Sequence, residues 1–387
     1  MRILVDYRPA LRERTGVGEY VHELAKALAR QATGDRNDQI TLFTSSWKDR
    51  PDPALASEMP ASVRVVDSKV PVRGLVWAWN RLEWPAVEWL AGAHDVVHSQ
   101  SPLLIPSRDA AQVVTIHDLD FLNNPELMTA EIRRDYPVLA RSHAVRADAV
   151  IVSSHYAAGE VTRQLGIDRA RIHICSPGQP AWAAGVRTRR AADPRRDHIL
   201  FVGTLSARKN VATLLRAYAR LAEQSPGVPP LVLAGHRTGY FDTQCASLCD
   251  QAATRHRVMV TGYVETPRRI DLYERAAMLV LPSYEEGFGL PVLEAMSCGV
   301  PVVVSSRGSL PEVAGAAASP IDPADIDGLS GAMRALLDPD CAAAAIARGL
   351  VQAARYEWAA CATAARGAYQ AAIDIHRRPE RGHAPRH

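Results

Sequence analysis

Short runs of aliphatic and β-branched residues recur along the whole chain, and a longer segment with helical periodicity follows each run. This alternation is typical of β–α–β units, in which parallel strands form a sheet that helices cover on both faces. The first series comprises residues 3–5, 40–43, 63–66, 96–97, 113–116 and 150–152. The second series comprises residues 199–202, 231–234, 258–260, 278–281 and 300–304. The pattern predicts an α/β protein with two Rossmann-like sheets.

The length of the chain sets the expected number of domains. Its 387 residues are too many for one compact α/β domain and fit two. We expect an N-terminal domain over 1–180 and a C-terminal domain over 197–360. Residues 361–387 are expected to form a helix, which packs back on the N-terminal domain, and a tail. The stretch 177–196 contains five arginines and no sustained apolar period, so an exposed linker is favoured over a phosphate site.

Composition excludes several classes of protein. The 45 Lys and Arg residues nearly balance the 42 Asp and Glu residues, and the net charge of +3 gives no reason to expect a nucleic-acid partner. The six cysteines show neither a C-x-x-C pair nor histidines at metal-ligand spacing, so we expect reduced thiols and no zinc site. No apolar run approaches the ~18 residues of a spanning helix, and the N-terminus does not resemble a signal peptide. A cytoplasmic protein is therefore expected.

Ligands of open α/β sheets bind beyond the carboxyl ends of the strands, so the loops after the predicted strands hold the candidate residues. The first such loop contains Gly16 and Gly18 and leads into an amphipathic helix over 20–30. Glycines at these positions let backbone N–H groups approach an anion at the positive end of the helix dipole. An ordinary tight turn is the alternative, because the third glycine of the dinucleotide fingerprint is missing.

The second loop contains His117, Asp118 and Asp120, directly after the run 113–116. A histidine there is suited to hydrogen-bond hydroxyl groups or to transfer protons. Alternatively, the aspartates cap the segment that follows. A metal-binding D-x-D motif is less favoured, because no further acidic cluster accompanies it.

The third and fourth loops carry charged residues after two strands of the second series. Arg208 and Lys209 stand beside a predicted helix start, where two cations favour an anion such as a diphosphate. Glu286 and Glu294 follow the run 278–281. Glu294 lies among apolar residues, where a carboxylate needs partners, and sugar or ribose hydroxyls are suitable ones.

The longest motif, residues 282–303, reads PSYEEGFGLPVLEAMSCGVPVV. It resembles the E-x7-E region of the retaining GT-B glycosyltransferases of glycosyltransferase family 4. Shorter stretches that resemble the same family are 16–18, 115–119, 152–154, 201–205, 208–210, 261–264, 308–313 and 356–358. The chain is similar above all to bacterial mannosyltransferases that build O-antigen and other surface polysaccharides. The resemblance implies two Rossmann-like domains that face each other across a cleft, and a reaction that needs no metal or other cofactor.

The resemblance also implies a role for each candidate residue. The implied catalytic residues are His117, which would hydrogen-bond the transferred sugar, Glu286, which would contact the donor sugar, and Lys209, which would neutralise the donor diphosphate. The implied donor-binding residues are Gly16, Gly18, Arg208, Lys209, Tyr263, Val264, Glu286, Gly287, Phe288, Gly289, Leu290 and Glu294. Many family members carry an arginine where this chain has Thr204, so Arg208 is expected to supply the second cation.

The same resemblance leads us to expect a nucleotide sugar as donor, with GDP-mannose favoured and a UDP-sugar as the alternative. A saccharide or lipid-linked sugar is the expected acceptor. Two other classes stay open, namely a nucleotide-sugar isomerase or hydrolase of the same fold and a two-domain sugar-binding protein. An NAD-dependent dehydrogenase is less favoured because of the missing third glycine.

Four tryptophans cluster in residues 76–90, at positions 77, 79, 84 and 89, near Arg73 and Arg81. Such a segment is suited to lie at a membrane surface and to meet a lipid-linked acceptor there. Core packing of the tryptophans is the alternative, and it is slightly favoured because Trp is a normal residue of helix packing. A peripheral membrane contact is therefore an open expectation.

Overall fold

The computed structural model describes residues 1–11, 14, 16–32, 37–53, 55–123, 130–251 and 253–378. Most of the basic tail expected after residue 376 lies outside these residues. The chain divides into two compact units. One comprises Met1–Gly178 together with Trp358–His387, and the other comprises Gln179–Glu357.

The first unit is built on a parallel sheet of seven strands in the order β3-β2-β1-β4-β5-β6-β7. The strands are β1 Arg2–Asp6, β2 Gln39–Thr44, β3 Arg64–Asp67, β4 Val96–Ser99, β5 Ala111–Thr115, β6 Ala149–Val152 and β7 Ile172–Ile174. The six strands predicted for this half are present. Strand β7 was not predicted, because His173 interrupts its two isoleucines. The strand order reverses between β1 and β4, and this switch point is where such sheets bind ligands.

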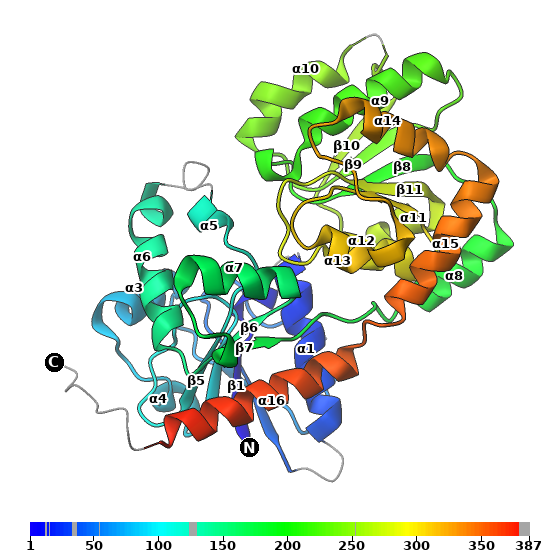
Figure 1. The fold of residues 1–387 in the computed structure, drawn as a ribbon. Helices are drawn as coiled ribbons and strands as arrows, with labels where there is room; N and C mark the ends of the chain where they lie inside the picture. The colour runs from blue at the N-terminus through cyan, green and yellow to red at the C-terminus, as the bar shows by residue number, and fades with distance from the viewer. Residues whose placement is uncertain are drawn as a thin grey trace. The chain divides into compact units, whose positions relative to one another are not determined.

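Helices cover both faces of this sheet. They are η1 Arg8–Ala10, α1 Gly16–Ala32, α2 Leu55–Glu58, α3 Val72–Leu82, α4 Glu88–Ala91, α5 Asp120–Asn123, α6 Ala130–Arg146, α7 His155–Leu165, η3 Arg169–Arg171 and α16 Trp358–His376. The C-terminal helix α16 lies alongside α1 in the core of this unit (Figure 1). Its buried face is rich in alanine, including Ala362, Ala365 and Ala368, and such small side chains allow a close approach.

The second unit is built on five parallel strands in the order β10-β9-β8-β11-β12. The strands are β8 His198–Val202, β9 Leu231–Ala234, β10 Val258–Gly262, β11 Ala276–Leu281 and β12 Val302–Val304. All five were predicted from the sequence. The order reverses between β8 and β11, which places the switch point at the carboxyl ends of these two strands.

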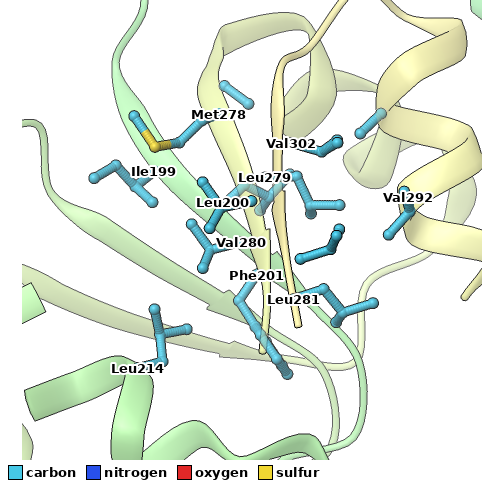
Figure 2. Packing of buried hydrophobic residues seen from close by; sticks show 14 of the residues in the cluster. Ile199, Leu200, Phe201, Leu214, Met278, Leu279, Val280, Leu281, Val292 and Val302 are labelled. Atoms are coloured by element: carbon cyan, nitrogen blue, oxygen red, sulfur yellow. The ribbon is translucent and has the colours of Figure 1, made fainter. Parts of the chain in front are cut away.

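The helical segments of the second unit pack on both faces of its sheet. They are α8 Ala183–Ala192, η4 Ala207–Lys209, α9 Val211–Gln224, η5 Phe241–Cys245, α10 Ala246–Cys249, α11 Thr266–Arg275, α12 Leu290–Ser297, α13 Leu310–Ala314, η6 Gly315–Ala317, α14 Ile326–Ala335 and α15 Pro339–Ala353. Figure 2 shows Leu214 of α9 and Val292 of α12 among the apolar residues of β8 and β11. None of the described helices is long and apolar enough to cross a membrane.

The prediction of a linker over 177–196 is wrong for most of that stretch, because α8 occupies it and packs within the second unit. Ala183 and Val186 enter the hydrophobic core. The buried Arg190 donates from Nη1 to the carbonyl oxygens of Tyr273 and Ala276, at 2.8 and 2.9 Å. The arginine-rich stretch has no helical repeat of apolar residues. Periodicity therefore does not predict α8, a helix that the buried Arg190 connects to the rest of the unit through hydrogen bonds.

Candidate active site

The loop after β8 brings two cations to the switch point of the second sheet. Arg208 and Lys209 lie in η4, and Asn210 follows them in the left-handed conformation with φ 56°. The Asn210 side chain donates from Nδ2 to the carbonyl oxygens of Pro282, at 3.1 Å, and of Pro323, at 2.7 Å. These bonds fasten the loop after β8 to the loop after β11, so the positions of the two cations are fixed.

Glu286 is the partner of both cations. The Lys209 Nζ atom lies 2.5 Å from Glu286 Oε1, and Arg208 Nη1 lies 3.4 Å from Glu286 Oε2. Ser283 donates its hydroxyl to the same Oε1 at 2.7 Å. Lys209 and Glu286 are both buried. The structure therefore brings together three of the predicted site residues, from two loops that are about 80 positions apart in the sequence, in one charged cluster.

The electrostatics of this cluster favour the ionised carboxylate. Burial alone raises the pKa of Glu286, but the positive charges of Lys209 and Arg208 act against it, and the pKa lies below its usual value. The cluster thus holds two cations against one anion. One net positive charge is left for a ligand that binds there.

Two residues after β12 hold the Glu286 backbone. Ser309 donates from its backbone N and from Oγ to the Glu286 carbonyl oxygen, at 3.1 and 3.0 Å. Gly308 has φ +64°, and a Cβ atom there would lie 2.7 Å from the Glu286 nitrogen. Only glycine fits at 308. Sequence reasoning gave no role in the site to Ser283 or Ser309, because their partners are known only from the folded chain.

Helix α12 begins at Leu290, directly after Gly289, whose φ of +90° suits glycine. A Cβ atom at 289 would lie 2.5 Å from Leu310 Cδ2, so the loop is closely packed there. Phe288 is buried in the core of the second unit, and its ring contacts Tyr356 edge-on at 5.4 Å. The Phe288 side chain therefore has a packing role. Only the backbone atoms of Phe288 are left to contact a donor substrate. Gly287 lies between Phe288 and the charged cluster.

Glu294 lies inside α12, and its carboxylate is buried. The Tyr273 hydroxyl of α11 donates to Glu294 Oε2 at 2.7 Å, and Arg269 Nη1 lies 3.7 Å from Oε1. The sequence predicted that this carboxylate needs partners, and these two residues supply them from within the protein. One helix turn separates Glu294 from the start of α12.

Tyr263 and Val264 follow β10 at the same edge of the sheet. The Tyr263 ring stacks on His236, with 5.2 Å between centroids and 14° between planes. His236 follows β9 and was not singled out in the sequence. Gly235, just before it, has φ +154°, and a Cβ atom there would lie 1.9 Å from the Gly203 oxygen. The three loops after β8, β9 and β10 therefore meet closely.

In the first unit, His117 lies just beyond β5. Burial lowers the pKa of His117 to about 4, so its ring is neutral at pH 7. The ring hydrogen-bonds the backbone of Gln100, while the buried Nε2 atom has no hydrogen-bond partner among the described residues. Tyr20 packs edge-on against the same ring, at 5.3 Å. The arrangement leaves Nε2 for a ligand.

Gly16 and Gly18 lie in the first turn of α1. The helix thus starts at Gly16, four residues before the predicted start. The first N–H groups of a helix lack partners within it, so this end of α1 offers donors to an anion. Tyr20 lies one turn further along α1, and its ring packs against His117, so the start of α1 lies near this histidine.

The aspartates after β5 form a turn. Asp118 Oδ1 accepts the backbone N–H of Asp120, the first residue of α5, at 3.2 Å. This agrees with the capping alternative for the D-x-D pattern. In the part of the chain that the structure describes, no group of three or more His, Cys, Asp or Glu side chains is arranged to hold a metal ion.

Comparisons with known proteins identify the family. Residues 187–349 match the family model described as glycosyl transferases group 1, and residues 14–179 match that described as glycosyltransferase family 4. An O-antigen chain mannosyltransferase B of Escherichia coli is 30% identical over 391 residues, which cover 96% of this chain and 100% of that protein. The chain therefore belongs to glycosyltransferase family 4, and it is a glycosyltransferase similar to mannosyltransferases of O-antigen synthesis.

Solved structures agree on the fold. Sucrose-phosphate synthase from Thermosynechococcus elongatus superposes with a TM-score of 0.74 at 21% identity, over 96% of this chain and 98% of that chain. Anabaena HepE in complex with UDP and glucose superposes with a TM-score of 0.65 at 16% identity, over 96% and 99%. The two units described above are the Rossmann-like domains of a GT-B glycosyltransferase.

Proposed function

We propose that this glycosyltransferase moves a hexose, mannose from GDP-mannose in first place, onto a saccharide or lipid-linked acceptor during surface polysaccharide synthesis. We further propose that the reaction retains the anomeric configuration and needs no metal. The observation that carries the proposal is the cluster of Arg208, Lys209 and Glu286 at the carboxyl ends of β8 and β11. Two fixed cations at a switch point suit the diphosphate of a nucleotide sugar.

The other residues of the second unit suit the remaining parts of such a donor. Glu294 is proposed to accept hydrogen bonds from the ribose hydroxyls, with Tyr273 fixing the orientation of its carboxylate. The backbone N–H groups of Gly289 and Leu290 stand at the start of α12, where the helix dipole favours a phosphate. Tyr263 and Val264 are proposed to flank the base.

His117 is proposed to bind the transferred sugar. Its neutral ring and its unpartnered Nε2 atom suit acceptance of a hydrogen bond from a sugar hydroxyl. A protonated histidine has no acceptor, so the lowered pKa serves this role at neutral pH. Gly16 and Gly18 are proposed to offer backbone N–H groups to the diphosphate.

The reaction follows from where charge develops. The bond between the anomeric carbon and the diphosphate oxygen breaks, and its electron pair leaves with the diphosphate. The acceptor hydroxyl oxygen forms the new bond to the anomeric carbon and gives its proton to the leaving diphosphate on the same face. Lys209 and Arg208 stabilise the negative charge, and the Glu286 carboxylate stabilises the positive charge on the sugar.

The choice of donor is supported by the relative from Escherichia coli, which is named a mannosyltransferase. A UDP-sugar is the second candidate, because Anabaena HepE is described in complex with UDP and glucose. An isomerase or hydrolase is less favoured, since the relative from Escherichia coli is named a mannosyltransferase.

Calorimetric titration with GDP and with UDP, followed by assays of nucleotide release from GDP-mannose and UDP-glucose, tests the donor. We expect GDP to bind more tightly than UDP. With a mannan-type acceptor present, GDP-mannose should turn over faster than UDP-glucose. Tight binding of UDP alone would contradict the donor assignment and leave the cation cluster in place. Binding of neither nucleotide would contradict the site itself.

A further inference from the structure

Helix α3 has two faces of different character. Leu75 and Trp79 are buried against the sheet of the first unit. The Trp79 ring contacts Phe43 at 5.8 Å, and its Nε1 atom donates to the Pro85 carbonyl oxygen at 2.9 Å. The expectation of core packing therefore holds for Trp79, one of the four clustered tryptophans.

The opposite face of α3 carries Arg73, Trp77 and Arg81, spaced four residues apart and all exposed. This spacing places the three side chains in one row along the helix. A tryptophan between two arginines in an outward row adds nothing to the core of the unit. The row is suited to contact something outside the chain.

Two more exposed tryptophans, Trp84 and Trp89, follow α3 in the sequence. The exposed fractions of Trp77, Trp84 and Trp89 are 59%, 56% and 59%, which rules out core packing for all three. The rings of Trp84 and Trp89 meet edge-on at 6.1 Å, and the guanidinium of the exposed Arg108 lies 5.1 Å from the Trp89 ring centre. Trp84, Trp89 and Arg108 therefore form one exposed aromatic and basic cluster, which the chain reaches directly after α3.

Helix α6 adjoins this surface at its C-terminal end. Arg146 of α6 pairs with Glu83, the residue after α3, at 2.5 Å, and Figure 1 shows α3 and α6 as neighbours in the first unit. Leu82 at the end of α3 and Val145 near the end of α6 are both exposed. An exposed apolar residue thus directly precedes each member of the ion pair in the sequence.

We propose that this surface docks the first unit on an anionic phospholipid bilayer. We call it the aromatic face and define it by Arg73, Trp77, Arg81, Leu82, Trp84, Trp89 and Arg108. Tryptophan rings are enriched at the level of the lipid headgroups, and arginines reach phosphates while their stems stay in apolar surroundings. Cations beside exposed tryptophans complement the negative charge of such a surface. The proposal does not depend on which nucleotide the second unit binds.

Co-sedimentation with vesicles of phosphatidylglycerol and phosphatidylcholine in equal parts tests the aromatic face, with pure phosphatidylcholine vesicles in parallel. We expect the full chain to bind the anionic vesicles, to bind them less as salt increases, and to show quenching of tryptophan fluorescence by brominated lipid. The triple variant Trp77→Ser, Trp84→Ser and Trp89→Ser should bind at least tenfold more weakly. The pair Arg73→Glu and Arg81→Glu should also lower binding, since each arginine near the surface contributes about fivefold.

A matched control comes from the second unit, where the apolar side chains of Met259 and Val351 are also more than half exposed. The variant Met259→Ser with Val351→Ser should bind vesicles as the parent chain does. Nucleotide titration of every variant shows that the second unit is intact, so a failure here is distinguishable from a failure of the donor assignment. Absence of binding to anionic vesicles, or equal binding by the triple variant, would overturn the proposal. A dimer in sedimentation velocity that the triple variant loses, without vesicle binding, would assign the face to a second copy of the chain instead.

Discussion

At the scale of single residues, Glu286 shows how a buried charge is kept in this fold. A carboxylate with so little exposure is stable only with partners, and Lys209, Arg208 and Ser283 provide them. The same cations are the groups that meet the diphosphate in the proposed reaction. Binding and stability therefore depend on one set of contacts, and substitutions there must be interpreted with a test of folding.

The variant Lys209→Ala is predicted to lower kcat by about 10²–10³-fold, because it removes one cation from the leaving diphosphate. Arg208 and Ser283 still contact Glu286, so we expect the chain to remain folded. Steady-state rates of nucleotide release, together with circular dichroism, measure both effects.

Lys26→Ala is the matched control, because Lys26 pairs with Glu23 at 2.8 Å in the first unit, outside the candidate site. It should leave kcat unchanged. Turnover by Lys209→Ala at the parent rate would show that Lys209 does not stabilise the leaving group.

How far the sequence predicts the site depends on the kind of residue. Arg208, Lys209 and Glu286 stand in loops after apolar runs, so their approach to one another follows from the parallel sheet. Ser283, Ser309 and Tyr273 act through hydrogen bonds to those residues or to Glu294, and no local pattern indicates such partners. The side chain of Phe288 is buried in the core, which a loop position in the sequence does not reveal.

At the scale of secondary structure elements, the strands were predicted best, because buried parallel strands are continuous apolar runs. The exception is β7, in which His173 interrupts two isoleucines. Helix α8 was missed because Arg190, a buried cation with carbonyl partners, takes the place of an apolar stripe. The predicted start of α1 came late because Gly16 and Gly18 were interpreted as a loop.

The role of Arg190 leads to a prediction about α8. Arg190→Ala should lower the free energy of unfolding of the second unit by about 2–4 kcal/mol, because it leaves the buried carbonyl oxygens of Tyr273 and Ala276 without this donor. Urea titration monitored by hydrogen exchange of peptides from the second unit measures this change.

Arg195→Ala provides the control for the α8 prediction. Arg195 lies in the same arginine-rich stretch, is exposed and pairs with Asp193 at 2.6 Å, so little change in stability is expected. If the two variants had the same free energy of unfolding, the hydrogen bonds of Arg190 would not stabilise the packing of α8.

At the scale of the whole molecule, the two units are predicted to respond differently to acid. The pKa of His22 is lowered to about 4 by burial and by Arg14, and the pKa of His98 is lowered to about 3 by burial and by His117. Both lie in the first unit. Below pH 6.5 the unfolded chain binds protons that these folded histidines do not bind, so acidification favours unfolding. The stability that the two histidines contribute is complete above pH 6.5. It is lost as the pH falls from 6.5 to the folded pKa, about 4 for His22 and about 3 for His98.

Each of these histidines should lower the stability of the first unit by about 1.4 kcal/mol per pH unit between pH 6.5 and its folded pKa. Hydrogen exchange measured at pH 7.5 and pH 5.5, corrected for the intrinsic rate, compares the two units in one sample. The second unit serves for comparison. It holds three of the thirteen histidines, and burial lowers the pKa of one of them, His198, so we expect a smaller loss of stability there. Equal stability of the first unit at both pH values would mean that these histidines are protonated in the fold.

In the proposed reaction Lys209 and Arg208, rather than a bound metal, take up the charge of a departing nucleoside diphosphate. The most direct test is the rate of GDP release from GDP-mannose, measured with the full chain and an acceptor in excess EDTA and again after Mg²⁺ or Mn²⁺ is restored. We expect the same rate of GDP release in both conditions. A rate that is lost in EDTA and returns with the metal would contradict this expectation.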